Sequence, residues 1–377
     1  MNVLYVCHDA GLYGASKSLL DLIDALKEYN VTSYIVIPYA GPIEKELIHR
    51  RIKYCIIRNY KDFRAVGEGN VIEETLNELK KLPAVKQVIQ LVQQWKIDII
   101  HTNNLCTDIG AMAALIKGIP HVWHIREFME EDFRIEFYNK RKMKYLINKA
   151  DTIILISKAI YGKHKKLYKK DRMKVIYDLI SLEDYNYSND KFYENETLNL
   201  LLCGAISRQK GQIEAVRAVN YLWEQGMKNI RLSIVGRGEK EDVTEIKNYI
   251  KRHKLQDAVV INDFNKDLKQ HRENSDIALM CSKSEGLGRV TIESMLSEIL
   301  VIGSNTGATK ELIRHGTTGY LYINGDYIDL ANQIVYAMEH KEEVGRIKEA
   351  AKKFAVNTFT TKALVEEVYK VYKTVLR

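Results

Sequence analysis

Two kinds of segment alternate along the chain in the pattern of apolar and polar residues. Runs of four to six residues, rich in Val and Ile, predict buried strands, and stretches with apolar residues at helical spacing predict helices between them. Strands separated by helices indicate parallel sheets, because parallel neighbours need a long crossover connection. We expect strands at 3–7, 33–37, 54–57, 97–101, 122–125, 152–156 and 174–177, and then at 198–203, 231–235, 258–261, 277–281 and 300–302.

The two series of strands predict two doubly wound α/β domains, a first at 1–180 and a second at 198–355. Between them, 181–197 is rich in Asn, Asp, Ser and Glu without an apolar period, and we interpret it as a linker. Near the end of the chain, apolar residues recur at helical spacing from Leu364 to Val375, so a helix there has to pack on another surface. Open parallel sheets bind ligands beyond the carboxyl ends of their strands, which makes the residues after each strand the candidates for function.

Composition excludes some classes of protein. With 46% hydrophobic and 28% charged residues over 377 positions, the chain is globular rather than disordered or fibrous. Five cysteines without a C-x-x-C pair indicate reduced thiols in a cytosolic protein. The chain begins without the basic and apolar regions of a secretory signal, and no run is long enough to span a membrane. We therefore expect a cytoplasmic protein, with attachment to the inner face of the cell membrane left open.

The net charge of +8 comes from one segment of the chain. Arg134 to Lys174 holds fourteen basic residues and three acidic ones, so the remainder is slightly negative. The part at 140–174 is either a solvated helix face, a surface that docks on anionic lipid, or a surface that receives an anionic or lipid-linked acceptor. Nucleic acid is disfavoured because no recognition motif accompanies the charge.

In the first domain, the turn after the first strand contains Gly11 and Gly14 and leads into a helix. It suits an anion or sugar phosphate at the helix N-terminus, although a plain strand-to-helix turn has the same composition. The glycines do not form G-x-G-x-x-G, and the second strand ends without an acid, which argues against an NAD-dependent dehydrogenase. His101 and His124 end two strands and are interpreted as substrate contacts rather than zinc ligands, because no third ligand follows at metal spacing.

In the second domain, the first strand is followed by Arg208, Lys210 and Gly211 at the start of a helix. Two cations and a glycine there suit a diphosphate, and a solvated basic loop remains the alternative. Arg237, between two glycines after the next strand, is a weaker signal of the same kind.

The strongest signal is the stretch SEGLGRVTIESML at 284–296. Glu285 lies in the predicted loop and Glu293 in the following helix, while Gly286 and Gly288 leave backbone amides uncovered between them. Carboxylates accept hydrogen bonds from sugar hydroxyls, and amides at a helix N-terminus hold phosphate oxygens. The alternative is that Glu285 only caps the helix.

With these motifs in order, the chain resembles the family 4, group 1, retaining glycosyltransferases of the GT-B architecture. The resemblance rests on the E-x7-E pair Glu285 and Glu293, on GATKELIRHGTTG at 307–319 and on ADTIILIS at 150–157. It implies two Rossmann-like domains facing a cleft and a terminal helix at 356–377 that crosses back to the first domain. The first domain would bind the acceptor and the second the nucleotide-sugar donor.

The resemblance also implies roles for individual residues. Glu293 would hold the ribose of the donor and Glu285 the transferred sugar, which His124 would also contact. The family has an arginine where this chain has Ala205, so we expect Arg208 or Arg237 to supply that cation beside Lys210. Three further sets of donor contacts are predicted. Backbone amides would hold the diphosphate in a cradle formed by Gly286, Leu287, Gly288, Arg289 and Val290, and Gly14 would leave room for the diphosphate on the side of the first domain. Asp263 and Phe264 would lie near the base.

The expected reaction is sugar transfer with retention, by front-face attack as proposed for the family, from a UDP-sugar or less favourably a GDP-sugar. Glu285, His124, Lys210 and Arg208 are the predicted catalytic residues. There is no D-x-D motif, so we expect no metal, and no cofactor is implied. The acceptor would be a cell-surface glycan or its lipid-linked precursor. Two alternatives are a degenerate GT-B subunit that partners another glycosyltransferase, which Ala205 supports, and a nucleotide-sugar epimerase, which the E-G-x-G start of the E-x7-E motif disfavours.

Overall fold

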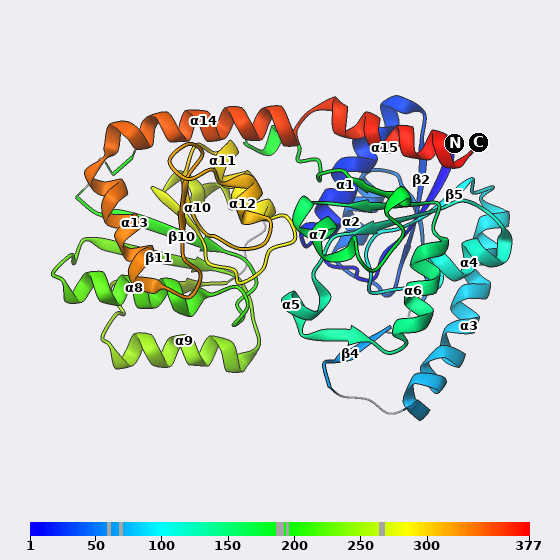
Figure 1. Cartoon of the computed structure of the whole chain (residues 1–377), viewed down its shortest axis with the longest axis horizontal. Coiled ribbons are helices and arrows are strands. Elements are labelled where there is room, and N and C mark those ends of the chain that lie inside the picture. Colours follow the sequence, from blue (N-terminus) through cyan, green and yellow to red (C-terminus); the bar gives the residue numbers. More distant parts are fainter. Residues whose placement is uncertain (59–61, 68–70, 186–191, 194–195, 264–267) are drawn as a thin grey trace. The chain divides into compact units, whose positions relative to one another are not determined.

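The computed structural model describes residues 1–58, 62–67, 71–185, 192–193, 196–263 and 268–377. The chain divides into two compact units, shown in Figure 1. Unit 1 is Met1–Ile180 together with Thr361–Arg377, and unit 2 is Ser181–Thr360.

Unit 1 is built on a seven-stranded parallel sheet with the order β3-β2-β1-β5-β6-β8-β9. The order runs in opposite directions from β1 and from β5, so the sheet reverses between these two strands, where α/β proteins bind ligands. Tyr5 of β1 pairs with His101 of β5. The strands are β1 (Asn2–Val6), β2 (Thr32–Ile37), β3 (Lys53–Ile56), β5 (Ile99–Thr102), β6 (His121–Ile125), β8 (Thr152–Leu155) and β9 (Met173–Val175).

Helices cover both faces of this sheet, because successive residues of a buried strand point to opposite sides. Val3 and Tyr5 pack in a cluster with α1 and α15, whereas Leu4 and Val6 pack with α3 and α4. Figure 1 shows α15 beside α1. The helices of unit 1 are α1 (Gly14–Leu26), α2 (Ile43–His49), α3 (Val71–Gln94), α4 (Ile109–Lys117), α5 (Met129–Phe133), α6 (Lys140–Lys149), α7 (Lys158–His164) and α15 (Lys362–Val375), with short 3-10 turns η1 (Lys27–Tyr29) and η2 (Lys170–Arg172).

The terminal helix returns to unit 1 as predicted, through Val365, Val368 and Val371, which are buried against its core. It is shorter than the expected 356–377. Residues 356–359 instead form the last turn of α14, and the helical conformation is interrupted at Thr360 before α15 begins.

Two short segments, absent from the predicted strands, form a small antiparallel pair in unit 1. Strands β4 (Phe63–Ala65) and β7 (Ile135–Phe137) are joined in register, and Arg64 Nε lies 3.1 Å from Glu136 Oε1 across the pair. Strands of three residues are too short to show a period in the sequence.

Unit 2 is built on a six-stranded parallel sheet with the order β12-β11-β10-β13-β14-β15. Its strands are β10 (Leu198–Cys203), β11 (Ile230–Val235), β12 (Val259–Asn262), β13 (Ile277–Met280), β14 (Leu300–Ser304) and β15 (Tyr320–Tyr322), the last of which was not predicted. Its helices are α8 (Gln212–Glu224), α9 (Lys240–Arg252), α10 (Lys269–Glu273), α11 (Arg289–Leu296), α12 (Thr309–Leu312), α13 (Tyr327–Glu339) and α14 (Lys341–Phe359), with a 3-10 turn η3 (Glu183–Tyr185).

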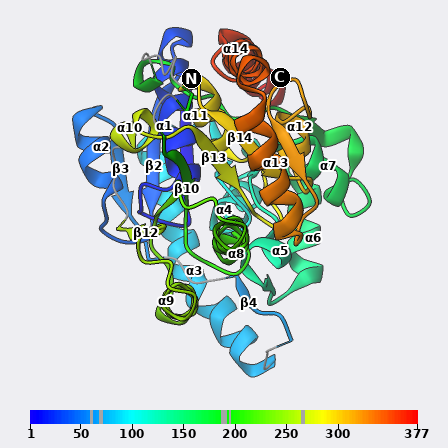
Figure 2. The ribbon, with the colours of Figure 1, turned by 90° about the vertical axis from the view of Figure 1, so that its left-hand side faces the viewer.

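This sheet also separates two apolar layers. Leu200 and Leu202 of β10 face the cluster that contains α8 and α13, which lie side by side in Figure 2. Leu201 and Cys203 face the opposite layer, where Val290 of α11 packs. Both units therefore have the doubly wound α/β architecture that the sequence predicts.

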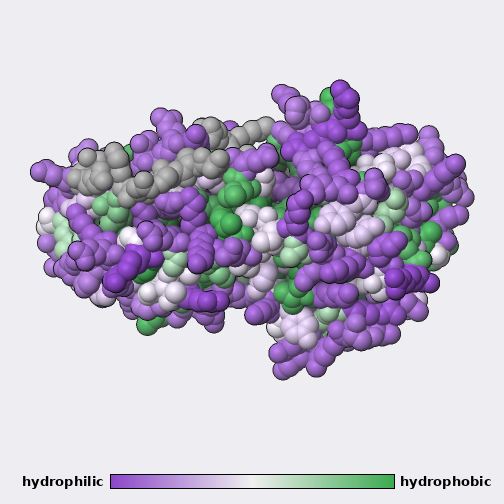
Figure 3. All heavy atoms as spheres, turned by 90° about the horizontal axis from the view of Figure 1, so that it is seen from above, coloured by the Kyte–Doolittle hydropathy of each residue, from purple (hydrophilic) through white to green (hydrophobic). Residues whose placement is uncertain are grey.

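In the view of Figure 3, polar side chains cover most of the surface of each unit. Within the described ranges, no helix has the length and apolar character needed to cross a membrane. All five cysteines are free thiols, as expected.

Candidate functional site

Two loops at the carboxyl edge of the unit 2 sheet are in direct contact, and Gly211 makes this possible. Gly211 precedes α8 with φ of +71°, and a Cβ at this position would lie 2.1 Å from the carbonyl oxygen of Cys281. The amide of Lys283 donates to the carbonyl of Gln209 at 2.8 Å. The loop after β10 and the loop after β13 are therefore fixed to each other by their backbones.

This contact brings Lys210 and Glu285 together. Lys210 Nζ lies 2.8 Å from Glu285 Oε2, and both side chains are only partly exposed, at 32% and 14%. Glu285 is also held from the side of α12, because the amide of Ala308 donates to its carbonyl at 2.9 Å. A Cβ on Gly307 would lie 2.7 Å from the Glu285 amide nitrogen, so this approach requires glycine. The sequence predicted that both residues belong to one site, and the structure places them in contact.

Glu293 lies on α11 with its carboxylate between two arginines. Arg289 Nε is 2.8 Å from Oε1, and Arg272 of α10 forms an ion pair with Oε2. The Arg272 guanidinium lies over the ring of Tyr185, 5.2 Å from its centroid. Burial raises the pKa of the Tyr185 hydroxyl, and the charge of Glu293 raises it further. Sequence reasoning missed Arg272 and Tyr185, since nothing in their local sequence marks them.

The predicted diphosphate cradle lies at the start of α11. Gly288 precedes this helix in the left-handed region, with φ of +88°, and Gly286 and Leu287 are buried beside it. The first N–H groups of any helix have no partner within the helix, and the helix dipole places positive charge there. The position is suited to an anion, and the role of these amides stays a prediction.

The two arginines predicted as substitute cations lie apart from the Lys210–Glu285 pair. Arg208 is 65% exposed, with its guanidinium 3.1 Å from Glu245 and 3.8 Å from Asp242, both on α9. Arg237 is 73% exposed and lies 3.9 Å from the exposed Asp263. In the part of unit 2 that the structure describes, Lys210 is the cation paired with Glu285. Phe264 lies outside the described residues.

In unit 1, two predicted residues lie at the carboxyl ends of β1 and β6. Gly14 begins α1, and a Cβ there would meet nothing within 4 Å, so the turn is open as the prediction requires. His124 is 3% exposed. Its Nδ1 lies 3.2 Å from a guanidinium nitrogen of Arg126 and 3.2 Å from Nε2 of His101. The two histidines predicted as neighbours are therefore in contact.

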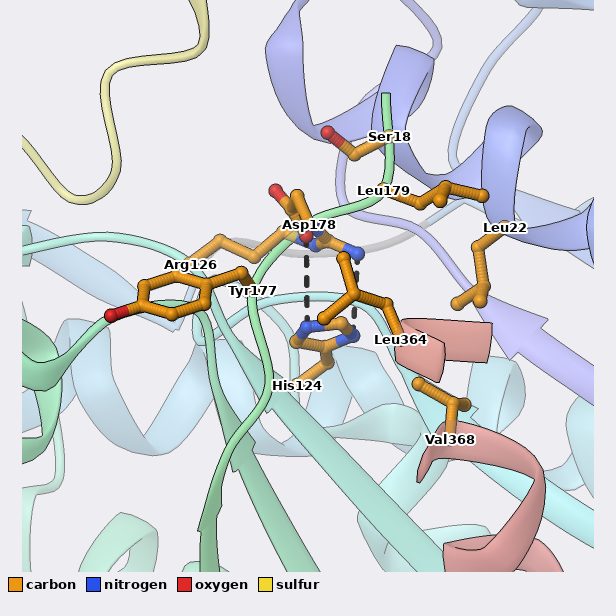
Figure 4. A pocket seen from close by; sticks show the side chains of 9 residues that line it. All are labelled: Ser18, Leu22, His124, Arg126, Tyr177, Asp178, Leu179, Leu364 and Val368. Atoms are coloured by element: carbon orange, nitrogen blue, oxygen red, sulfur yellow. Dashed lines mark hydrogen bonds and ion pairs between the residues drawn. The ribbon is translucent and has the colours of Figure 1, made fainter. Parts of the chain in front are cut away.

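Arg126 organises this buried group, shown in Figure 4. It donates from Nε to Asn103 Oδ1 at 3.0 Å and forms an ion pair with Asp178. Burial holds the pKa of His124 well below its ordinary value, and the charge of Arg126 lowers it further, so the imidazole is neutral. The cavity beside it has a volume of about 10 Å³, enough for one water-sized group. It is lined by Ser18, Leu22, His124, Arg126, Tyr177, Asp178, Leu179, Leu364 and Val368.

Three carboxylates meet elsewhere in unit 1, at Asp62, Glu78 and Asp108. Two ammonium groups lie among them. Lys81 Nζ is 2.9 Å from Glu78 and 3.3 Å from Asp108 and also pairs with Asp62, and Lys142 pairs with Glu78 and Asp108. Because the lysines occupy the positions of a cation, this is a buried ion cluster that joins α3, α4 and α6 rather than a metal site.

Comparison with known proteins places this geometry in a family. The model of Glycosyltransferase Family 4 matches residues 13–184, and that of Glycosyl transferases group 1 matches residues 187–354. The capsular polysaccharide biosynthesis glycosyltransferase CapM of Staphylococcus aureus is 25% identical over 290 residues, or 71% of this chain and 74% of CapM. An α-1,4-N-acetyl-D-galactosaminyltransferase of Campylobacter jejuni is 23% identical over 95% of both chains.

The fold matches solved structures over its full length. The crystal structure of HepE from Anabaena in complex with UDP-glucose superposes with a TM-score of 0.83, at 22% identity, over 99% of this chain and 100% of HepE. The sucrose-phosphate synthase of Thermosynechococcus elongatus gives a TM-score of 0.79 at 15% identity, over 100% of this chain and 99% of that enzyme. The two family models account for nearly all of the sequence between them, and the chain belongs to the group 1 glycosyltransferases of the GT-B architecture.

Proposed function

We propose that this glycosyltransferase moves a hexose from a UDP-sugar to a glycan acceptor, with retention of configuration and without a metal ion. The observation that carries the proposal is the Lys210–Glu285 pair at 2.8 Å, held by backbone contacts beside the N-terminus of α11, with Glu293 eight positions after Glu285. The HepE structures contain UDP and UDP-glucose, which supports UDP as the nucleotide.

The chemistry follows from where charge develops. Breaking the bond between the anomeric carbon and the donor phosphate leaves positive charge on the sugar ring and negative charge on the departing UDP. Lys210 and the first amides of α11 are fixed donors for that negative charge, each contributing about 3 kcal/mol when well placed. Glu285 accepts hydrogen bonds from hydroxyls of the transferred sugar. The acceptor hydroxyl attacks from the side of the leaving phosphate, and the phosphate takes the acceptor proton, so configuration is retained.

The first experiment incubates the purified chain with UDP-, GDP- and dTDP-sugars in EDTA and measures release of the nucleotide. We expect slow hydrolysis of a UDP-sugar, reduced about 10²-fold or more in Lys210→Met and Glu285→Gln. Lys353→Met, which removes an exposed lysine of α14, is the matched control and should behave as wild type. NMR of the product identifies the anomer and tests retention.

The same experiment distinguishes an active glycosyltransferase from the alternative, a degenerate GT-B subunit. Ala205, which replaces the family arginine, is exposed, and Arg208 is bound to α9 instead. This arrangement favours a degenerate subunit if the chain proves inert. Absence of hydrolysis together with absence of saturable UDP binding would support a binding partner of another glycosyltransferase, and saturable binding with hydrolysis would reject it.

We propose further that the acceptor is presented at the cytoplasmic face of a membrane, because unit 1 carries an exposed basic surface on α6 and the adjoining loop 165–170. The amide of Lys169 donates to Asn148 Oδ1 at 2.8 Å, which joins the loop 165–170 to α6. Tyr145 and Leu167 are exposed among the cations, at 53% and 44%. The exposed basic residues of this surface are Lys140, Arg141, Lys144, Lys149, Lys165, Lys166, Lys169 and Lys170. Each contributes about 1 kcal/mol near anionic lipid. The relative in Campylobacter jejuni is named for an undecaprenol-linked acceptor.

Vesicle sedimentation tests the basic surface. Reversing Lys165, Lys166, Lys169 and Lys170 to Glu should abolish pelleting with vesicles that contain anionic lipid at low salt. The matched control reverses four exposed lysines of unit 2, on and just after α9, at Lys240, Lys247, Lys251 and Lys254. Equal pelleting of both variants would reject membrane docking through this surface and would leave the donor chemistry untouched.

A further inference from the structure

The hydrogen bonds around His124 determine where its proton is. A guanidinium has only donors, so the His124 Nδ1 that lies 3.2 Å from Arg126 must be the acceptor and carries no hydrogen. The ring is neutral, because burial and the charge of Arg126 both hold its pKa well below the ordinary value. The single proton of the imidazole is therefore on Nε2.

The same reasoning determines the state of His101. His101 Nε2 lies 3.2 Å from His124 Nδ1, which is already an acceptor, so His101 Nε2 must be protonated. Burial and Arg126 likewise hold the pKa of His101 well below its ordinary value, so this ring is neutral too and its Nδ1 is an acceptor. The partner of that Nδ1 is the hydroxyl of Tyr372 at 2.6 Å, which must donate.

Tyr372 belongs to α15, in the segment that returns to unit 1 from the end of the chain. Its hydroxyl oxygen also lies 3.2 Å from that of Tyr5 on β1, where Tyr372 is again the donor, so His101 Nδ1 and the Tyr5 oxygen compete for one hydrogen. Tyr5, Tyr372, His101 and His124 are all buried. The contact with His101 is the shorter of the two, at 2.6 Å, so we assign the hydrogen of Tyr372 to His101 Nδ1, and the chain of contacts then ends at His124 Nε2–H.

His124 Nε2 has no hydrogen-bond partner among the described residues. The oxygen of Asp178 lies 3.9 Å away, beyond hydrogen-bond distance, and is engaged by Arg126. His124 lines the water-sized cavity together with Leu364 and Val368 of α15 (Figure 4). A buried N–H without a partner is costly, so an oxygen atom in this cavity is favoured.

We infer that Tyr372 and His101 are positioning residues, which hold His124 as a neutral hydrogen-bond donor that presents Nε2–H to one oxygen atom of the bound substrate. The terminal helix thereby contributes to the sugar site as well as to the core. The inference rests on the proposed function for the identity of the substrate, and the arrangement of protons does not depend on it.

Histidine nitrogen NMR of the full chain, labelled with 15N histidine, tests the arrangement without any turnover. In the wild type at pH 7, His101 and His124 should both be neutral with the proton on Nε2. A proton on Nδ1 of His124, or a charged ring, overturns the inference even if the donor assay succeeds. If the donor assay fails and the tautomers are as stated, only the proposed function fails.

Tyr372→Phe then tests the role of the helix. Loss of the hydroxyl frees His101 Nδ1, and we expect the His101 and His124 nitrogen signals to move toward mixed tautomers. The turnover number should fall about two- to tenfold, the equivalent of one neutral hydrogen bond, with unchanged affinity for UDP. Tyr369→Phe is the matched control on the same helix, since Tyr369 packs on Tyr29, with the ring centroids 4.9 Å apart. Nitrogen signals of Tyr372→Phe identical to wild type would overturn the positioning role.

Discussion

Gly211→Ala is the substitution whose effect can best be worked out from the structure. Gly211 has φ of +71°, a region that costs an alanine about 1 kcal/mol. The new Cβ would lie 2.1 Å from the Cys281 carbonyl oxygen and 2.9 Å from the carbonyl carbon, so the two loops have to separate by about 1 Å. Forced backbone shifts of this kind cost about 1–3 kcal/mol. We expect the free energy of unfolding to fall by about 2–4 kcal/mol.

The same shift reaches the site, because Gly211 is the neighbour of Lys210 and Cys281 begins the loop that carries Glu285. A displacement of about 1 Å between catalytic groups can reduce the rate about 10²-fold. Urea denaturation measures the stability, and release of UDP from a UDP-sugar measures the rate. The variant should be impaired in both.

Substitutions at two other glycines separate the cost of backbone strain from the cost of the collision with Cys281. Gly226 has φ of +90° with open space around a Cβ, so Gly226→Ala carries the backbone strain without the collision. Gly345, inside α14, also has open space, and Gly345→Ala should stabilise the chain by up to about 1 kcal/mol. If Gly211→Ala unfolds at the same urea concentration as Gly226→Ala and keeps wild-type activity, the close contact with Cys281 does not hold the site.

Two further predictions concern buried charges. Arg272→Met removes one of the two arginines that pair with Glu293, and losing one partner of a buried pair should lower the free energy of unfolding by about 3 kcal/mol. Lys269→Met on the same helix, 54% exposed, should change it by less than about 1 kcal/mol. Equal effects of the two substitutions in urea denaturation would contradict the buried pair. Burial lowers the pKa of His164 to about 4, while an unfolded histidine titrates near about 6.5. Between these values only the unfolded chain binds the proton, so stability falls as the pH falls, by about 1.4 kcal/mol per pH unit. In His164→Phe, the free energy of unfolding should therefore fall less steeply as the pH falls, by the contribution of one proton. Equal slopes in variant and wild type between pH 6 and 5 would refute the assignment.

The fold was predictable where strands are long and buried on both sides. Such strands are continuous apolar runs, and β10 at Leu198–Cys203 matches the predicted 198–203. The strands β4, β7 and β15 have three residues each and were missed, since so short a run has neither a period nor a distinctive length. Their positions depend on the elements they pair with, which the local sequence does not contain.

The same limit applies to the site. Lys210 and Glu285 follow the first and fourth strands of the unit 2 sheet. Because ligands bind beyond the carboxyl ends of parallel strands, the sequence could place both residues in one site. Arg272 reaches Glu293 from a separate helix, and Tyr185 lies in a stretch interpreted as a linker, so their contacts arise only from tertiary packing. Arg208 was expected beside Lys210. Acidic side chains of α9 bind it instead, because Glu245 and Asp242 face the same loop from the next crossover helix.

Backbone contacts, rather than side-chain packing, set the geometry of the Lys210–Glu285 pair. Gly211 and Gly307 each allow a backbone approach that a Cβ would block, one on the lysine side and one on the glutamate side. Main-chain atoms are common to all residue types, so the pair keeps its position when a neighbouring side chain differs, as Ala205 differs from the family arginine. Replacing a side chain beside the pair should therefore change the charge available to the leaving group, whereas replacing either glycine should change the distance between the two groups. The crystal structure of Gly307→Ala, compared with that of a chain carrying Arg at position 205, would separate these effects, and an unchanged distance of 2.8 Å in the glycine variant would show that side-chain packing is enough.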